Sequence, residues 1–345
     1  MTQRVDIVPA PGSAGSALDG RLTAPVDAES PHDPGALTPT LDFRFREQRS
    51  LWGNAWRQFR RHKLAMFGLV VLVVMLLATF VGSPVYPESY DQISSDFNFT
   101  TGTLTWQHPF GVDDLGRDIL ARILWGGRIS LAVGIVAAFV AILVGTTVGA
   151  VAGFFGGAAD TLLMRLTDLF ISLPQIPLLL VISFLYNQAF YNYFEERFGN
   201  GVLGTFVLIV LVIGMLNWMP TARLVRASFL STREKEFIEA ERSIGTSRGA
   251  QMFKHILPNV ISPIIVAATL GIGAAIITES ALSFLGLGFP SDVPTWGSML
   301  YLAKDRIQIA PNEAIFPGMM IFLTVLAINY IGDGLRDALD PRKSQ

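Results

Sequence analysis

The chain has no cysteine and few charged residues, and both absences limit what it can be. Without cysteine, disulfide scaffolds, thiolate metal sites and cysteine nucleophiles are excluded. Only 16% of its 345 residues are charged whereas 51% are hydrophobic, which is too apolar for an ordinary soluble domain. A formal net charge of −2 also does not fit a general nucleic-acid binder, which is normally basic.

Motifs for metal and nucleotide chemistry are missing as well. The four histidines lie far apart in the sequence, and no HExxH spacing occurs. No GxxxxGK[ST] loop is present to hold nucleotide phosphates. The apolar segments contain no GxSxG element, so a membrane enzyme is a remote alternative. We therefore predict no catalytic residue, no cofactor and no metal site, and an ATP-driven process would need a separate ATPase.

The N-terminal region divides into two parts. Residues 1–42 are rich in Pro, Gly, Ala, Ser and Asp without an apolar period, which predicts a disordered tail. Residues 43–63 are basic and aromatic, with Trp52, Trp56 and Phe59 at helical spacing, as in a helix that lies in the headgroup layer of a bilayer. A nucleic-acid patch would look similar, but the apolar run that follows favours a cytoplasmic membrane anchor.

Six apolar segments predict an all-α integral membrane protein with six transmembrane helices. They cover about residues 64–82, 129–155, 162–186, 202–219, 260–286 and 314–331. With the start of the chain inside, the inner segments from residue 43 onward hold 18 Lys and Arg residues and the outer segments hold 6. This bias predicts that both termini and the loop 220–259 are cytoplasmic. No internal repeat is evident, which is weak evidence against an inverted-repeat secondary transporter.

Two of these segments have distinctive small or breaking residues. Gly145, Gly149 and Gly153 recur at four-residue spacing, so one face of the second span allows another helix to approach closely. Pro174 and Pro177 fall inside the third span, where broken backbone hydrogen bonds are tolerated only beside protein or a water-filled path.

Three charged residues fall within or near the spans. Arg165 and Asp168 lie one turn apart, and an ion pair at the membrane interface is favoured over a proton relay. Glu279 lies towards the end of the fifth span, where a carboxylate is either functional or a structural group that reaches the interface.

The loop Ser231–Pro258 has more order than a simple connection needs. Ser231 and Glu234 fit a capping box at the start of a short helix. Apolar residues largely on one side of that helix then give it an amphipathic pattern: Phe237, Ile238, Ala240 and Ile244.

A second short helix is expected to follow in the same loop. Gly245 suits the left-handed end of the first helix, and Thr246 or Ser247 can cap the next one. Pro258 is expected to stop or kink that second helix. A charged helix–Gly–helix unit of this kind indicates a docking surface for another protein.

This loop resembles the EAA motif of ABC importer permeases. The matching residues are Glu239, Ala240, Gly245, Leu257 and Pro258. The resemblance implies a coupling helix that seats on a cytoplasmic ATPase subunit. Glu241 and His255 depart from the general consensus of alanine and isoleucine, although histidine at this position is similar to the peptide-importer branch.

Three further stretches, residues 108–131, 279–300 and 329–342, resemble permeases of dipeptide/oligopeptide importers. The resemblance covers about residues 50–342 and implies a type I ABC importer permease fold over residues 64–342, in a bacterial inner membrane. It also implies the partners: a second permease, two ATPase subunits and an extracytoplasmic substrate-binding protein. Nickel or another small solute remains open as cargo, and so does an ion-coupled secondary transporter that uses Glu279, Asp168 and Arg165.

The stretch 108–131 also has a physical interpretation of its own. Asp113, Asp114, Arg117 and Asp118 fall close together between glycines. A salt-bridged turn is favoured over a divalent-cation site, because the alternating ligand pattern of a calcium loop is missing. In the stretch 279–300, Trp296 is expected to be an interfacial anchor.

Overall fold

The computed structural model describes residues 51–93 and 104–340, which form helices without any strand. The expected tail 1–42 and residues 43–50 of the basic segment lie outside the described residues. The helices are α1 (Leu51–Arg61), α2 (Lys63–Leu77), η1 (Ala78–Gly82), α3 (Ser83–Val85), α4 (Ile119–Phe155), α5 (Gly157–Ser172), α6 (Gln175–Phe198), α7 (Gly201–Leu216), α8 (Met219–Arg233), α9 (Glu236–Ser243), α10 (Arg248–Ala250), η2 (Gln251–Ile256), α11 (Leu257–Phe284), α12 (Trp296–Ala303), η3 (Lys304–Arg306) and α13 (Asn312–Leu339).

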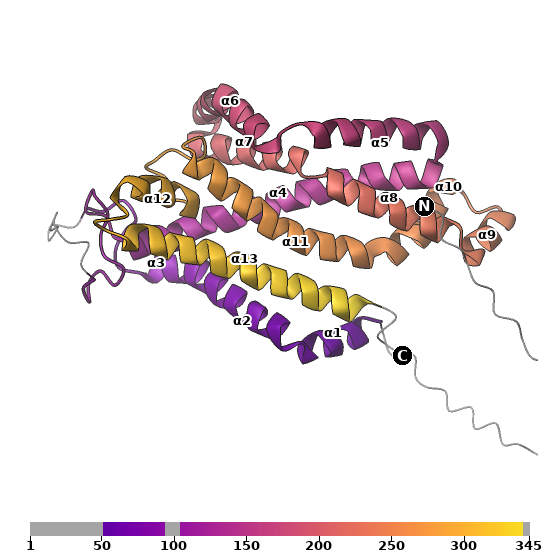
Figure 1. Cartoon of the computed structure of the whole chain (residues 1–345), viewed down its shortest axis with the longest axis horizontal. Coiled ribbons are helices and arrows are strands. Elements are labelled where there is room, and N and C mark those ends of the chain that lie inside the picture. Colours follow the sequence, from indigo (N-terminus) through magenta and orange to yellow (C-terminus); the bar gives the residue numbers. More distant parts are fainter. Residues whose placement is uncertain (1–50, 94–103, 341–345) are drawn as a thin grey trace, which may run out of the picture. The chain divides into compact units, whose positions relative to one another are not determined.

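The long helices of residues 51–340 run side by side between two ends (Figure 1). Helices α1, α9 and α10 lie with the last turns of α13 at one end, which we name the α9 end. Helices α3 and α12 lie at the other, which we name the α12 end. Helix α4 joins the two ends in one unbroken run of 37 residues, about 55 Å at the α-helical rise.

Four helical runs are long and apolar enough to cross a membrane: Lys63–Val85, Ile119–Phe155, Arg248–Phe284 and Asn312–Leu339. Two bent pairs, α5 with α6 and α7 with α8, also qualify if each pair counts as one span. The described residues therefore hold four to six candidate spans. Five of the six apolar segments of the sequence fall within one of these runs or pairs, and the fifth, 260–286, extends two residues past its run at Phe284.

Short side chains and helix-breaking residues determine where these helices end. Asp118 caps α4, since its Oδ1 accepts the backbone N–H of Ala121 at 2.7 Å. The chain leaves α4 through Gly156, whose φ of 66° favours glycine. Leu173 and Pro174 then separate α5 from α6, which meet at 83°. The prolines of the third span thus mark a real break.

The glycine stripe of α4 packs against α8. A Cβ added to Gly145 would stand 2.6 Å from the carbonyl oxygen of Trp218, and one added to Gly153 would stand 2.7 Å from the Cβ of Phe229. Gly149 lies between them against Ala222 and Val225. The two backbones approach so closely that a larger side chain would separate the helices.

Two local expectations were wrong, each because tertiary packing overrides a local pattern. Phe59 is buried against Ala65 and Gly334 instead of lying in the headgroup layer. Trp296 is fully buried, and its Nε1 donates to the carbonyl of Ile123 at 3.1 Å, so it is no interfacial anchor. At Pro258 a stop or a kink was expected, and the stop does not occur, since the helix runs from Arg248 to Phe284 with a wider π-helical turn over Gln251–Ile256 just before the proline.

Candidate functional site

The loop between α8 and α11 is a compact structure at the α9 end. Helix α9 ends at Ser243, and Gly245 just beyond its end has the positive φ of 80° expected from the sequence. Ser247 caps α10, as its Oγ accepts the backbone N–H of Ala250 at 3.3 Å. The expected capping box at Ser231 and Glu234 does not form, because α8 continues through Ser231 as far as Arg233. Helix α9 begins instead after Lys235, without a side-chain cap.

A single buried residue anchors α9. Ile238 is fully buried in an apolar cluster with Val225 and Phe229 of α8 and Ile256 and Val260 at the start of the fifth span. Burying an isoleucine side chain contributes about 1.5–3 kcal/mol. The short helix is thus fixed to both neighbouring spans, although α9 has only 8 residues.

Polar side chains close the second half of the loop. Glu241 accepts the hydroxyl of Thr246 at 2.8 Å and lies 3.2 Å from Nδ1 of His255. Gln251 donates from Nε2 to the carbonyl of Thr246 at 2.8 Å. Asn259 donates from Nδ2 to the carbonyl of His255 at 2.6 Å. The residue before it, Pro258, has no backbone N–H to donate to the preceding turn. These bonds hold the turn at Gly245 between two ordered segments.

The outer surface of this loop is apolar and charged at once. The expected apolar face of α9 is divided, because only Ile238 faces inward. Ile244 is 80% exposed, and Phe253 and Phe237 are exposed too. Glu239, Ala240 and Gly245 lie on the same exposed loop, while Leu257 is half-buried and Pro258 is exposed in the first turn of α11.

A cavity of about 730 Å³ lies between this loop and the ends of α4 and α8. Its lining includes Phe154 and Phe155 from α4 and five charged residues: Arg233, Glu234, Glu239, Arg242 and Arg248. Arg233 also donates from Nη1 to the carbonyl of Phe154 at 2.9 Å, which ties the end of α8 to the end of α4.

Two ion pairs join α5 to α8. Asp168 lies 2.6 Å from Arg223, with both side chains more than half exposed, and Asp160 pairs with Arg226 through two hydrogen bonds. The expectation that Asp168 pairs with Arg165 was wrong, because α8 brings a better-placed guanidinium across the helix interface. The three charged residues grouped as ion or proton sites are not brought together: Glu279 has quite different partners.

Glu279 is fully buried within the chain on α11. Its carboxylate oxygens accept hydroxyls from Ser283 at 2.8 Å and from Ser130 of α4 at 3.2 Å. Ser130 in turn accepts the backbone N–H of Trp296 at 3.2 Å. The carboxyl therefore ties α4, α11 and the start of α12 together through hydroxyl groups.

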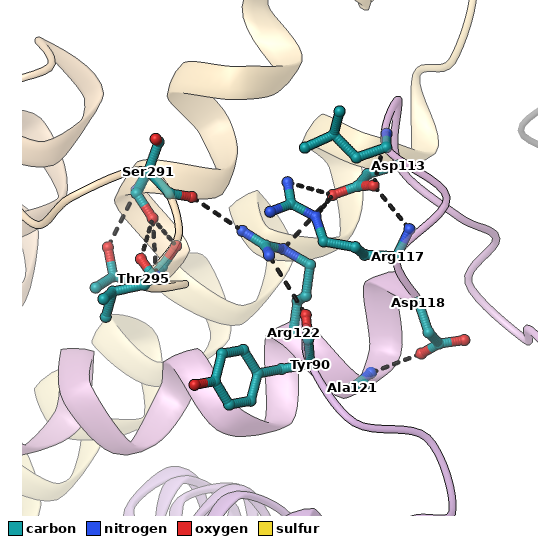
Figure 2. Close-up of polar contacts among 11 residues, drawn as sticks. Tyr90, Asp113, Arg117, Asp118, Ala121, Arg122, Ser291 and Thr295 are labelled. Atoms are coloured by element: carbon teal, nitrogen blue, oxygen red, sulfur yellow. Dashed lines mark hydrogen bonds and ion pairs between the residues drawn. The ribbon is translucent and has the colours of Figure 1, made fainter. Parts of the chain in front are cut away.

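The α12 end is organised around a second buried ionic residue, Arg122 (Figure 2). Arg122 is 1% exposed, and its Nε lies 3.7 Å from Asp113. Its other nitrogens reach the carbonyls of Tyr90 at 3.4 Å and Ser291 at 3.5 Å. Asp113 also binds Arg117, with the Nε of Arg117 at 2.8 Å. The expected salt-bridged turn is confirmed, and it extends to an arginine that the sequence did not single out.

A neighbouring carboxylate completes this network. Asp118 caps α4 with one oxygen, and the other lies 2.8 Å from Nδ1 of His108 and 3.4 Å from the hydroxyl of Tyr86. Burial and the Asp118 carboxylate raise the pKa of Tyr86 to about 12, so its hydroxyl stays a neutral donor. The segment before α4 is thus fastened to the helix by charge-assisted hydrogen bonds.

Comparison with known proteins assigns the family. A family model described as "Binding-protein-dependent transport system inner membrane component" matches residues 145–345, and one described as "N-terminal TM domain of oligopeptide transport permease C" matches residues 50–104. The chain belongs to the binding-protein-dependent inner membrane components. It is therefore a multi-pass inner-membrane permease subunit of an ABC importer and not an enzyme, and the ATPase is a separate subunit.

Relatives of this permease match over most of their length. The dipeptide transport permease DppC of Alkalihalophilus pseudofirmus is 40% identical over 85% of this chain and 90% of the relative. The oligopeptide transport permease OppC of Haemophilus influenzae is 37% identical over 86% and 90%, and the glutathione transport permease GsiD of Pectobacterium atrosepticum is 39% identical over 89% and 97%. Among solved structures, the inward-facing methionine ABC transporter MetNI matches at 17% identity with a TM-score of 0.44, over 63% of this chain and 95% of that one.

Proposed function

We propose that this permease forms, with a second permease subunit, the translocation path for di- or oligopeptides delivered by an extracytoplasmic substrate-binding protein. Two ATPase subunits bind at the cytoplasmic side and drive the transport cycle. The peptide cargo is supported by the names of the relatives, which are dipeptide, oligopeptide and glutathione transport permeases. The alternative cargo, nickel or another small solute, has no such support from the names of these relatives.

The observation that carries the proposal is the loop at the α9 end. It is anchored by Ile238 and braced by Glu241, yet its exposed face carries Ile244 and Phe253. An exposed apolar group beside charged residues is typical of a surface that another protein covers. We infer that the ATPase covers it, with Glu239, Ala240 and Gly245 at the contact.

The proposed orientation has the α9 end in the cytoplasm. Lys and Arg residues predominate in the segments that would then be inside, in agreement with the positive-inside rule. Helix α1, with Arg60 and Arg61 in its last turn, lies at the same end. The network around Arg122 would then face the substrate-binding protein.

Coupling between ATP hydrolysis and the membrane helices follows from how the loop is attached. The loop continues into α8 on one side and α11 on the other, and the glycine stripe of α4 packs on α8. The pairs Asp160–Arg226 and Asp168–Arg223 join α5 to the same helix. A movement of the loop is therefore transmitted to several spans, and the ATPase state selects between two arrangements of them.

The test is co-purification of the ATPase with a charge-reversed loop. We expect Glu239→Lys to abolish peptide uptake and to lose the ATPase on purification, while the permease still inserts. Glu196→Lys is the matched control, because Glu196 is an exposed glutamate at the end of α6, away from the loop. Retention of the ATPase and normal uptake by Glu239→Lys would contradict the coupling role.

A further inference from the structure

The two bent spans break at the same place. Helices α5 and α6 meet at 83° across Leu173 and Pro174, and α7 and α8 meet at 45° across Asn217 and Trp218. Gln175 donates from Nε2 to Oδ1 of Asn217 at 3.0 Å, which joins the two breaks directly.

Asn217 also supports the break on its own helix. Its Nδ2 donates to the carbonyl of Ile213 at 2.8 Å, so both ends of the amide are in use. On the other side of the break, Trp218 packs edge-on against Phe170 of α5, with ring centroids 6.1 Å apart. The amide pair is thus part of an ordered junction between four helices.

This junction lies far from both ends of the spans. Helix α7 has 16 residues and α8 has 15, so the break at Asn217 divides that pair into halves of about 24 and 22 Å. Helix α5 also has 16 residues, which puts Gln175 about 24 Å from its start. Because the hydrocarbon core is about 30 Å thick, both amides fall at membrane depth.

The amides are nevertheless not buried within this chain. Residues 171–177 are all exposed, Gln175 among them, and Asn217 is half-buried. Irregular backbone and polar side chains at membrane depth are stable only against protein or beside water. The surface at the junction is therefore not a lipid-facing surface.

A cavity of about 290 Å³ adjoins Asn217. It is bounded by α4, α7, α8 and α11, and its walls are mostly small or apolar residues such as Ala138, Ala141 and Gly271. Asn217 and Thr221 supply polar groups, and no charged residue is among those that line it. Such a cavity accepts a neutral polar chain more readily than an ion.

We propose that the junction is a subsite of the translocation path, where the amides of Gln175 and Asn217 bind the backbone amide groups of a passing peptide. A carboxamide offers both N–H donors and a C=O acceptor, so it pairs with a peptide group whatever the peptide's side chains are. The ligand class rests on the proposed function, whereas the accessibility of the junction does not.

The absence of cysteine in this chain permits a direct test. Gln175→Cys and Asn217→Cys are made singly, and the assembled transporter in membrane vesicles is treated with a charged, membrane-impermeant methanethiosulfonate. The control is Val74→Cys, because Val74 is 57% exposed in the middle of the first span and has an apolar environment. The unsubstituted transporter gives the background from the partner subunits.

We expect both junction cysteines to be labelled at least about tenfold faster than Cys at position 74, and peptide with its binding protein to slow that labelling. Of the two amides, only that of Asn217 bonds to the backbone of its own helix, so Asn217→Cys is the variant at greater risk of misfolding. If it fails to fold, Gln175→Cys still tests the subsite. If both junction cysteines are labelled as slowly as Cys at position 74, with and without ATP, the junction is not open to water and the subsite is overturned. A second permease that covers the junction would give this result. Unslowed labelling in a transporter that imports peptide would overturn peptide binding here. A transporter that imports no peptide would overturn the proposed cargo instead.

Discussion

At the α12 end of the bundle a charged group is buried in a network of polar contacts, whereas on the loop at the α9 end an apolar side chain is exposed. Arg122 is 1% exposed and meets Asp113 and two backbone carbonyls. Ile244 is 80% exposed on a loop that is otherwise anchored and hydrogen-bonded. The buried charge of Arg122 finds its partners within the chain. The exposed side chain of Ile244 is typical of a surface that another protein covers.

The difference predicts two kinds of variant. Substitutions in the network around Arg122 should act on the stability of the fold, because each removes a partner from a buried charge. Substitutions on the exposed face of the α9 end should act on coupling and leave stability nearly unchanged. Variants from both ends, compared in the same assays, can therefore break or sharpen the contrast.

The largest effect is expected for Gly245→Pro. Gly245 has a φ of 80° and donates its N–H to the carbonyl of Arg242 at 3.1 Å. Proline fixes φ near −65° and has no N–H, so the angle between α9 and α10 must change. We expect peptide uptake to be abolished while immunoblots find normal amounts of the protein in the membrane.

The matched control is Gly249→Ala. A Cβ would meet no atom within 4 Å at Gly245 or at Gly249, so the two sites differ in backbone conformation and not in space. Gly249→Ala should transport normally. Wild-type uptake by Gly245→Pro would show that the turn angle is unimportant for coupling.

A smaller effect, on stability, is expected for Asp113→Ala. This change leaves Arg117 and Arg122 without their carboxylate, and breaking a buried pair costs about 3–5 kcal/mol. The apparent melting temperature of the purified transporter should fall clearly. Asp114→Ala is the control, since Asp114 is exposed one residue away. Equal melting temperatures for the two variants would mean that the network does not hold the α12 end together.

The helices could be predicted from the sequence because membrane spans are encoded locally. Apolar length defined the six segments, and the prolines at 174 and 177 anticipated the break between α5 and α6. Gly245 was also predicted correctly, and Ser247 is the cap among the two candidates, Thr246 and Ser247, because turn and cap chemistry depends on a few neighbouring residues.

Partners across helices could not be predicted in the same way. Asp168 binds Arg223, which is 55 residues away, and not Arg165 in the next turn. Arg122 had no local signal beyond its apolar surroundings, since Asp113, Tyr90 and Ser291 meet it only in the folded chain. Glu279 likewise depends on Ser130, which lies 149 residues earlier.

The smallest effect, and the one specific to the α9 end, is expected for Ile244→Ser. If the ATPase covers this side chain, its removal from the contact costs on the order of 1–2 kcal/mol, or roughly tenfold in affinity. The melting temperature should not change, because Ile244 is already 80% exposed in the chain alone. Ile309→Ser is the control: Ile309 is 68% exposed, just after η3 near the α12 end. Binding of the purified ATPase to permease in nanodiscs measures the difference. Equal affinities for the two variants would mean that the exposed apolar group of the loop is not part of the ATPase contact, leaving Glu239 and its neighbours to carry it.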